Sequence, residues 1–228
     1  MSYPPVTMKK IAFVALFAAL LAAPLLTEEH APSAVSPSEA TDRLKKGNAA
    51  FVAGRPRGQD LLSQVKATAS GQHPWAAVLS CMDSRVPPEL VFQQGIGDLF
   101  SVRVAGNVAD VDDLGSLEYA AKAVGVRLLV VMGHTECGAV KGAIDDVKLG
   151  NLTELLAKIR TAMSAAGAPG TSKDAAYVDR IAEANVRQTM REIREKSPVI
   201  KELLDSGKTG LVGAMYDVQT GKVKILAD

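Results

Sequence analysis

The sequence predicts one α/β domain with a mainly parallel central sheet flanked by helices, an N-terminal helical arm and a C-terminal edge hairpin. Three short, uninterrupted apolar runs, at residues 75–80, 99–104 and 127–132, have the pattern of strands covered on both faces. Helical patterns at residues 88–93 and 114–124 separate them, and strands that alternate with helices form parallel sheets. The chain has 228 residues, 47% of them hydrophobic, which is enough to bury one sizeable core.

Residues 1–34 are predicted to be a signal peptide and leader, which leaves residues 35–228 as the folded domain. Lys9 and Lys10 supply a positively charged start, and residues 11–23 form an apolar run shorter than the roughly 20 residues of a membrane span. We therefore expect export, to the periplasm or out of the cell, and no stable membrane span after cleavage. The alternative is an uncleaved leader that anchors the chain in a membrane.

The folded part opens with the signals of a helix start. Ser36 can cap the helix, Pro37 suits the first helical position and Glu39 can close a capping box. The helix is expected to end at Gly54, because glycine tolerates the left-handed conformation that follows many helices. A second helix, at residues 60–69, completes the predicted N-terminal arm.

Three helices and a hairpin are predicted after the last of the three apolar runs. The helical patterns cover residues 152–166, 175–195 and 198–204. Two strand patterns, at residues 210–218 and 222–226, flank a short turn that contains glycine. Strands joined in this way form an antiparallel hairpin, which we place at the edge of the sheet.

Charge and composition narrow the class of partner. The chain has 26 Lys and Arg against 25 Asp and Glu, so its net charge does not favour nucleic acid or an acidic membrane surface as a partner. A small molecule is therefore the expected partner. The two cysteines exclude a disulfide-stapled mini-scaffold and a zinc site made of cysteine alone within one chain.

Both cysteines directly follow predicted strands. Cys81 comes after the run at residues 75–80, and His134 and Cys137 lie just past the run at residues 127–132. Ligands gather at the carboxyl ends of the strands in open parallel sheets, so the two loops can converge. Two thiolates and one imidazole can hold a catalytic zinc that keeps its fourth position open, and soft sulfur favours zinc over magnesium or calcium.

Plainer interpretations of the same residues stay open at this point. Cys81 and Cys137 of an exported protein can form a disulfide. His134 can be an ordinary hydrogen-bonded histidine, and Asp83 with Arg85 can be a surface ion pair of little energetic consequence.

The conjunction of motifs resembles the β-class carbonic anhydrases. Ser80-Cys81-Met82-Asp83-Ser84-Arg85-Val86-Pro87 and Gly133-His134-Thr135-Glu136-Cys137-Gly138 are similar to the two zinc motifs of that family. The similarity extends from residues 44–48 to residues 212–217, so that only the leader lies outside it. The resemblance implies a zinc enzyme that catalyses the reversible hydration of carbon dioxide to bicarbonate and a proton.

By the same resemblance one zinc ion per chain is held by Cys81, His134 and Cys137. Asp83 and Arg85 are implied to be catalytic and to pair with each other. The family also has a closed state in which the aspartate itself ligates zinc, so Asp83 is a fourth implied metal ligand. A homodimer with pockets at the subunit boundary, or a tetramer of paired dimers, is implied as the assembly.

Four further residues are implied to bind substrate. Gln72 matches the amide donor of the family, Phe100 and Tyr119 match the aromatic walls of its pocket, and Gly138 follows the last zinc cysteine. One branch of the family has a tryptophan of a bicarbonate inhibitory site where this chain has Val78, so the resemblance does not extend to that regulation. Two alternatives remain: hydrolysis of carbon disulfide or carbonyl sulfide at the same zinc site, and a non-catalytic, disulfide-bonded α/β binding module.

Overall fold

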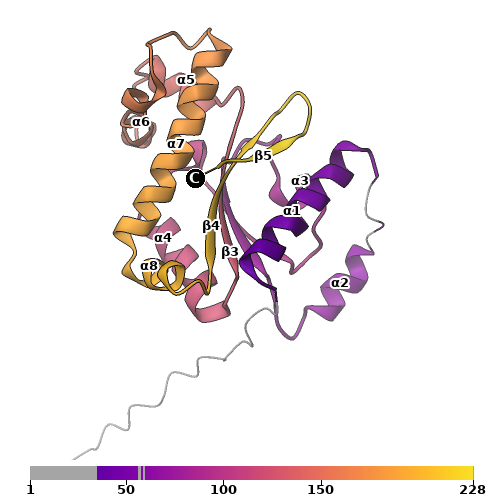
Figure 1. Cartoon of the computed structure of the whole chain (residues 1–228). Helices are drawn as coiled ribbons and strands as arrows, with labels where there is room; N and C mark the ends of the chain where they lie inside the picture. Colours follow the sequence, from indigo (N-terminus) through magenta and orange to yellow (C-terminus); the bar gives the residue numbers. More distant parts are fainter. Residues whose placement is uncertain (1–34, 56–57, 59, 228) are drawn as a thin grey trace, which may run out of the picture.

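A five-stranded sheet forms the centre of the domain in the computed structural model, which describes residues 35–55, 58 and 60–227 (Figure 1). The predicted signal peptide and leader lie outside these residues. The strands are β1 (Ala76–Ser80), β2 (Leu99–Arg103), β3 (Leu128–His134), β4 (Gly210–Tyr216) and β5 (Val223–Ile225), in the spatial order β2-β1-β3-β4-β5. The first four pair in parallel and β5 pairs antiparallel with β4. The mainly parallel sheet and its edge hairpin are therefore confirmed.

The central strands β1 and β3 are buried on both faces, as their continuous apolar runs predict. Strand β2, which was predicted to be covered in the same way, is instead an edge strand whose residues are partly buried or exposed. Every residue of β1 and of β3 is buried. Because successive side chains of a strand point to opposite faces, Leu129 and Val131 enter a core cluster shared with helix α7 (Ala175–Lys196). Leu128 and Val130 enter a second cluster, shared with helix α1 (Pro37–Val52). Helices on both faces thus hold the sheet, and with it the ends of β1 and β3 (Figure 1).

The helices occupy most of the predicted regions. They are α1 (Pro37–Val52), α2 (Leu61–Ala67), α3 (Pro88–Val91), α4 (Val111–Glu118), α5 (Gly138–Ile144), α6 (Leu152–Arg160), α7 (Ala175–Lys196) and α8 (Pro198–Asp205). At the start of α1 the Ser36 hydroxyl accepts the backbone N–H of Glu39 at 3.3 Å, and the Glu39 carboxylate accepts the backbone N–H of Ser36 at 2.8 Å. The expected capping box is therefore formed.

Three regions depart from the sequence expectations. The helix expected from residue 114 begins earlier, at Val111, because Asp110 and Asp113 form a capping box that the hydrophobic pattern does not reveal. The last six residues of this predicted helix form a π-helix, η2 (Tyr119–Val124). The helix predicted at residues 152–166 is divided into α6 and a short 3-10 helix, η3 (Met163–Ala166).

No helix was predicted from the sequence at the position of α5. Gly138 and Gly142 give its short sequence a poor helix propensity. Its helical form depends on tertiary packing, because Val140 and Ala143 are buried in the core cluster on the α7 side. This helix matters for the site, since it begins directly after Cys137.

The predicted N-terminal arm consists of α1 and α2. Figure 1 shows α2 apart from the layers around the sheet, and the helix has no buried residue. Leu61, Leu62 and Val65 of α2 are exposed apolar residues. None of the helices in the described part of the chain has the length and hydropathy needed to cross a membrane.

Candidate metal centre

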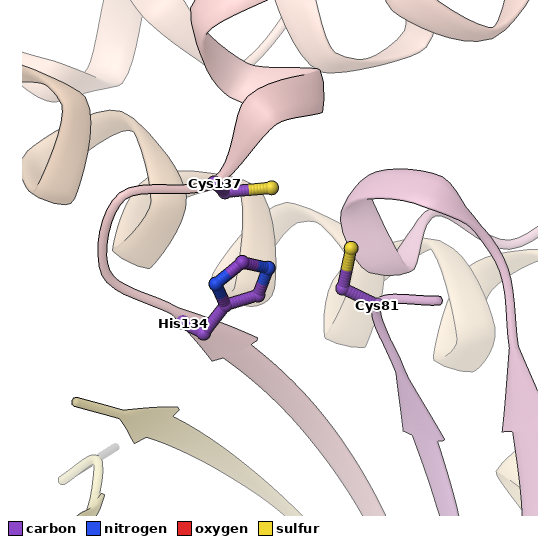
Figure 2. A group of neighbouring side chains, drawn as sticks. All are labelled: Cys81, His134 and Cys137. Atoms are coloured by element: carbon purple, nitrogen blue, oxygen red, sulfur yellow. The ribbon is translucent and has the colours of Figure 1, made fainter. Parts of the chain in front are cut away.

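Cys81, His134 and Cys137 converge at the carboxyl edge of the sheet (Figure 2). Cys81 follows the last residue of β1, His134 is the last residue of β3 and Cys137 caps the start of α5. Parallel pairing of β1 with β3 brings the ends of the two strands side by side. The sulfur atoms of the cysteines and a ring nitrogen of His134 lie within 4.8 Å of one another, and all three residues are buried.

The His134 ring has one nitrogen free for a metal. Its Nδ1 lies 2.8 Å from the carbonyl oxygen of Thr135. A carbonyl oxygen only accepts hydrogen bonds, so Nδ1 carries a proton, and in the neutral ring Nε2 then presents a lone pair. Nε2 is buried and has no hydrogen-bond partner among the described residues. A buried acceptor beside two sulfurs is the arrangement that a zinc ion would complete.

The two cysteines are free thiols in the structure. The hydrogen bond between their sulfurs lowers the pKa of Cys81 to about 4 and, together with burial, raises the pKa of Cys137. Loss of one proton from the pair is therefore favoured, and loss of the second proton is opposed. A divalent cation that replaces this second proton would be bound by two thiolates.

Backbone and side-chain contacts hold the two ligand loops. Arg103 donates from Nε to the carbonyl of Cys81 at 3.3 Å and from Nη2 to the carbonyl of Asp83 at 2.6 Å. In the other loop Glu136 has a positive φ of 57°, and its N–H donates to the carboxylate of Asp179 at 3.3 Å. The sharp turn between His134 and Cys137 is thereby stabilised by a contact with α7.

Asp83 and Arg85 form a bidentate ion pair beside the three ligands. Arg85 donates from Nε to Oδ1 of Asp83 at 2.9 Å and from Nη2 to Oδ2 at 2.7 Å, and its backbone N–H donates to Oδ1 at 2.9 Å. These hydrogen bonds from Arg85 lower the pKa of Asp83 to about 2. Oδ2 of Asp83 lies 3.9 Å from Nε2 of His134. The carboxylate is thus next to the candidate metal position but is bound by Arg85.

The predicted substrate residues do not all lie at this edge of the sheet. Gly138 is exposed and directly follows Cys137. Gln72 is also exposed, but it precedes β1, whereas Cys81 follows it. The five residues of β1 span about 16 Å, so within one chain Gln72 is at the far end of the strand from Cys81.

Phe100 and Tyr119 lie together, apart from the three ligands. Their ring centroids are 6.1 Å apart in an edge-to-face arrangement, and Tyr119 is 52% exposed. Phe100 pairs in the sheet with Ala77, at the opposite end of β1 from Cys81. The two rings line a pocket of about 610 Å³ between β2 and α4, and none of the three candidate ligands belongs to its lining.

Two supporting groups were missed by the sequence prediction. Arg103 lies near the end of β2, and the Ala105–Asn107 loop, η1, carries an N–H group that faces Cys81. An arginine at a strand end and a Gly-Asn pair that begins three positions later were the available signals. Neither signal identifies Cys81 as the group contacted, because that depends on the pairing of β1 with β2.

Comparison with known proteins agrees with the motifs. A family model described as carbonic anhydrase matches residues 76–223. The chain is 36% identical over 193 residues to Carbonic anhydrase 2 of Mycobacterium tuberculosis, covering 82% of this chain and 91% of that protein. It is 35% identical over 196 residues to a carbonic anhydrase of Mycolicibacterium smegmatis, covering 83% of this chain and 93% of that protein.

Solved structures show the same likeness. The β-carbonic anhydrase CafA of Aspergillus fumigatus superposes with a TM-score of 0.67 at 26% identity, covering 84% of this chain and 91% of that chain. A Coccomyxa β-carbonic anhydrase in complex with acetazolamide gives a TM-score of 0.64 at 26% identity, covering 84% of this chain and 83% of that chain.

Proposed function

The chain belongs to the β-carbonic anhydrase family, and we propose on this premise that it catalyses the reversible hydration of carbon dioxide to bicarbonate and a proton with one zinc ion per chain. The observation that carries the proposal is the unpartnered Nε2 of His134 beside the sulfurs of Cys81 and Cys137. Two thiolates and one imidazole suit zinc, and they leave a fourth position for reaction.

The donor set fits the ion in charge as well as in type. Cys81 and Cys137 as thiolates would balance the two positive charges of zinc, and the proton on Nδ1 of His134 fixes the ring so that Nε2 is the ligand. When bound, zinc would act as a Lewis acid and lower the pKa of a water molecule toward about 7, which supplies the nucleophile at neutral pH.

Asp83 and Arg85 would control the fourth position. With a pKa near 2, Asp83 is a carboxylate at neutral pH and can accept a hydrogen bond from the attacking group, which orients that group toward carbon dioxide. Arg85 occupies both oxygens of Asp83 and so keeps the carboxylate off the metal. We propose that Asp83 becomes a fourth zinc ligand only when Arg85 releases it.

The apolar wall and the amide donor are proposed to come from a second copy of the chain. Carbon dioxide is apolar, so Phe100 and Tyr119 suit it, and the Gln72 amide can donate to an oxygen that gains charge during attack. Within one chain all three lie at the far end of β1 from the ligands. A homodimer, which could pair again into a tetramer, would bring them to the partner's metal site. The exposed apolar side chains of α2 and the free edge of β2 support such an interface.

Subunit mixing tests this assembly. Gln72→Ala and Cys81→Ser should each lower hydration, but co-refolded mixtures of the two should exceed the average of the separate variants. The reason is that a hybrid dimer has one site with an intact Cys81 from one chain and an intact Gln72 from the other. As the control, Cys81→Ser mixed with His134→Ala should gain nothing, because every chain then lacks a ligand. If the mixture of Gln72→Ala with Cys81→Ser shows only the average hydration activity of the two separate variants, a site shared between two chains is contradicted.

Two rival functions use the same residues differently. A carbon disulfide or carbonyl sulfide hydrolase would act at the same zinc site, and a binding module would hold Cys81 and Cys137 as a disulfide. We expect purified protein to hydrate carbon dioxide in stopped-flow measurements, to release no sulfide from either compound at a comparable rate, and to show two titratable thiols once unfolded and freed of zinc. Dominant sulfide release, or no free thiol and no zinc, would favour a rival.

Export is a separate proposal, which rests on Lys9, Lys10 and the apolar residues 11–23. We expect the mature protein in the periplasm or the medium, with its first residue between Leu25 and Ser38, because cleavage follows the apolar run. N-terminal sequencing of fractionated cells checks this. An intact Met1 in a purely cytoplasmic fraction would refute export, and an intact leader in the membrane fraction would identify an uncleaved anchor.

A further inference from the structure

Asn185 is a buried polar residue on the face of α7 that packs against the sheet. It is 1% exposed, and its Nδ2 donates to the carbonyl oxygen of Gly106 at 2.7 Å, across 79 positions of sequence. Its Oδ1 has no hydrogen-bond partner in the described part of the chain. Burying a half-satisfied amide is costly, and a leucine of similar size would avoid that cost. Stability alone therefore does not explain an asparagine here, and its one side-chain hydrogen bond among the described residues goes to Gly106.

Gly106 lies between Asn185 and a candidate metal ligand. Its backbone N–H donates to Sγ of Cys81 at 3.3 Å. Only glycine fits at this position: φ is 68°, and a Cβ atom would lie 2.4 Å from Cδ1 of Ile159 and 3.3 Å from Cβ of Ala139. Glycine is also the residue with the greatest backbone freedom, so its N–H stays directed at a sulfur only if other groups fix its conformation.

We propose that Asn185 is a positioning residue for the metal centre, whose amide locks Gly106 so that the Gly106 N–H remains directed at the Cys81 sulfur. The inference rests on the zinc site proposed above. A hydrogen bond to a thiolate stabilises the negative charge on sulfur and lowers the energy of its lone pairs. Without Asn185, the conformation of Gly106 is no longer fixed, and its N–H can turn away from the sulfur. Cys81 then loses a hydrogen bond that holds its sulfur in the ligating position, and the sulfur lone pairs lie at higher energy.

Two variants of α7 separate this role from simple packing. Asn185→Leu removes the amide but keeps the volume, and Thr189→Val removes a buried polar group one turn further along the same helix, where the side chain is 2% exposed. Loading each protein with Co²⁺ gives a sulfur-to-cobalt absorption band, and competition with a chelator gives the zinc affinity. For Asn185→Leu we expect the band at longer wavelength and zinc affinity reduced by about 10- to 100-fold. Thr189→Val should match the wild type in both.

The outcomes are distinct. A folded Asn185→Leu protein with the wild-type band and affinity overturns the proposal, and so do equal changes in both variants. If Asn185→Leu does not fold, NMR of protein loaded with a magnetic cadmium isotope decides. A scalar coupling from the metal to the Gly106 amide proton, weakened in Asn185→Asp, supports the lock, and its absence or an unchanged value overturns it. Wild-type protein that takes up Co²⁺ without a sulfur band would instead refute the metal site itself.

Discussion

Cys81→Ser is expected to purify as a folded protein that contains no zinc and shows no measurable hydration of carbon dioxide, and His134→Ala is expected to behave in the same way. Each change removes one of the three candidate ligands at a buried site. The remaining donors cannot hold the ion against water, and without the ion the described residues around the site do not activate a water molecule at neutral pH. Zinc analysis, circular dichroism and stopped-flow hydration check the three parts of this result.

The chain offers a matched control for the histidine change. His73 is exposed and lies outside the cluster formed by Cys81, His134 and Cys137. His73→Ala should therefore keep full zinc content. Full zinc occupancy in Cys81→Ser or His134→Ala would place the metal elsewhere and would rule out this site.

Arg85→Ala should impair turnover far more than zinc binding. Arg85 is not a ligand, but it holds both oxygens of Asp83. Without it, Asp83 is a free carboxylate beside a divalent cation, and at about 4 Å with an effective dielectric of 20 the attraction is roughly 4 kcal/mol per unit of opposing charge. Asp83 should then bind zinc and occupy the fourth position. We expect full zinc content and a loss of hydration activity of about 100-fold or more.

A crystal structure distinguishes this closed state from other causes of low activity, because X-ray absorption counts two sulfur and two light-atom ligands whether water or Asp83 fills the fourth position. Arg85→Ala should show two sulfur ligands and two light-atom ligands, and a crystal structure should assign one of the latter to Asp83. The control is Arg85→Ala combined with Asp83→Asn, because a neutral amide has little tendency to bind zinc and should leave the fourth position open. Near-normal hydration in Arg85→Ala would show that another group holds Asp83 away from the metal.

Much of the sheet could be predicted because its signals are local. The apolar runs that become β1 and β3 are each covered on both faces, and a strand of that kind is recognisable without knowledge of its neighbours. The convergence of Cys81 and Cys137 also follows from local signals, since two parallel strands that end next to each other bring their following loops together.

What could not be predicted depends on contacts between distant segments. Helix α5 has weak propensity and forms because Val140 and Ala143 find partners in the core. The contact from Asn185 to Gly106 joins residues 79 positions apart, so no window of sequence contains both. The separation between Gln72 and the candidate ligands of the same chain becomes apparent only when the direction and length of β1 are known. Sequence motifs identified the residue types, and the fold shows that Gln72 and Cys81 lie at opposite ends of β1.

Stopped-flow hydration of carbon dioxide, measured on one preparation before and after removal of zinc, tests the central claim most directly. The wild-type protein should contain one zinc ion per chain and hydrate carbon dioxide rapidly. Chelation should abolish hydration, and one equivalent of zinc should restore it to the wild-type protein but not to Cys81→Ser. Hydration that survives complete loss of zinc, or a zinc-loaded protein that does not hydrate carbon dioxide, would contradict the account.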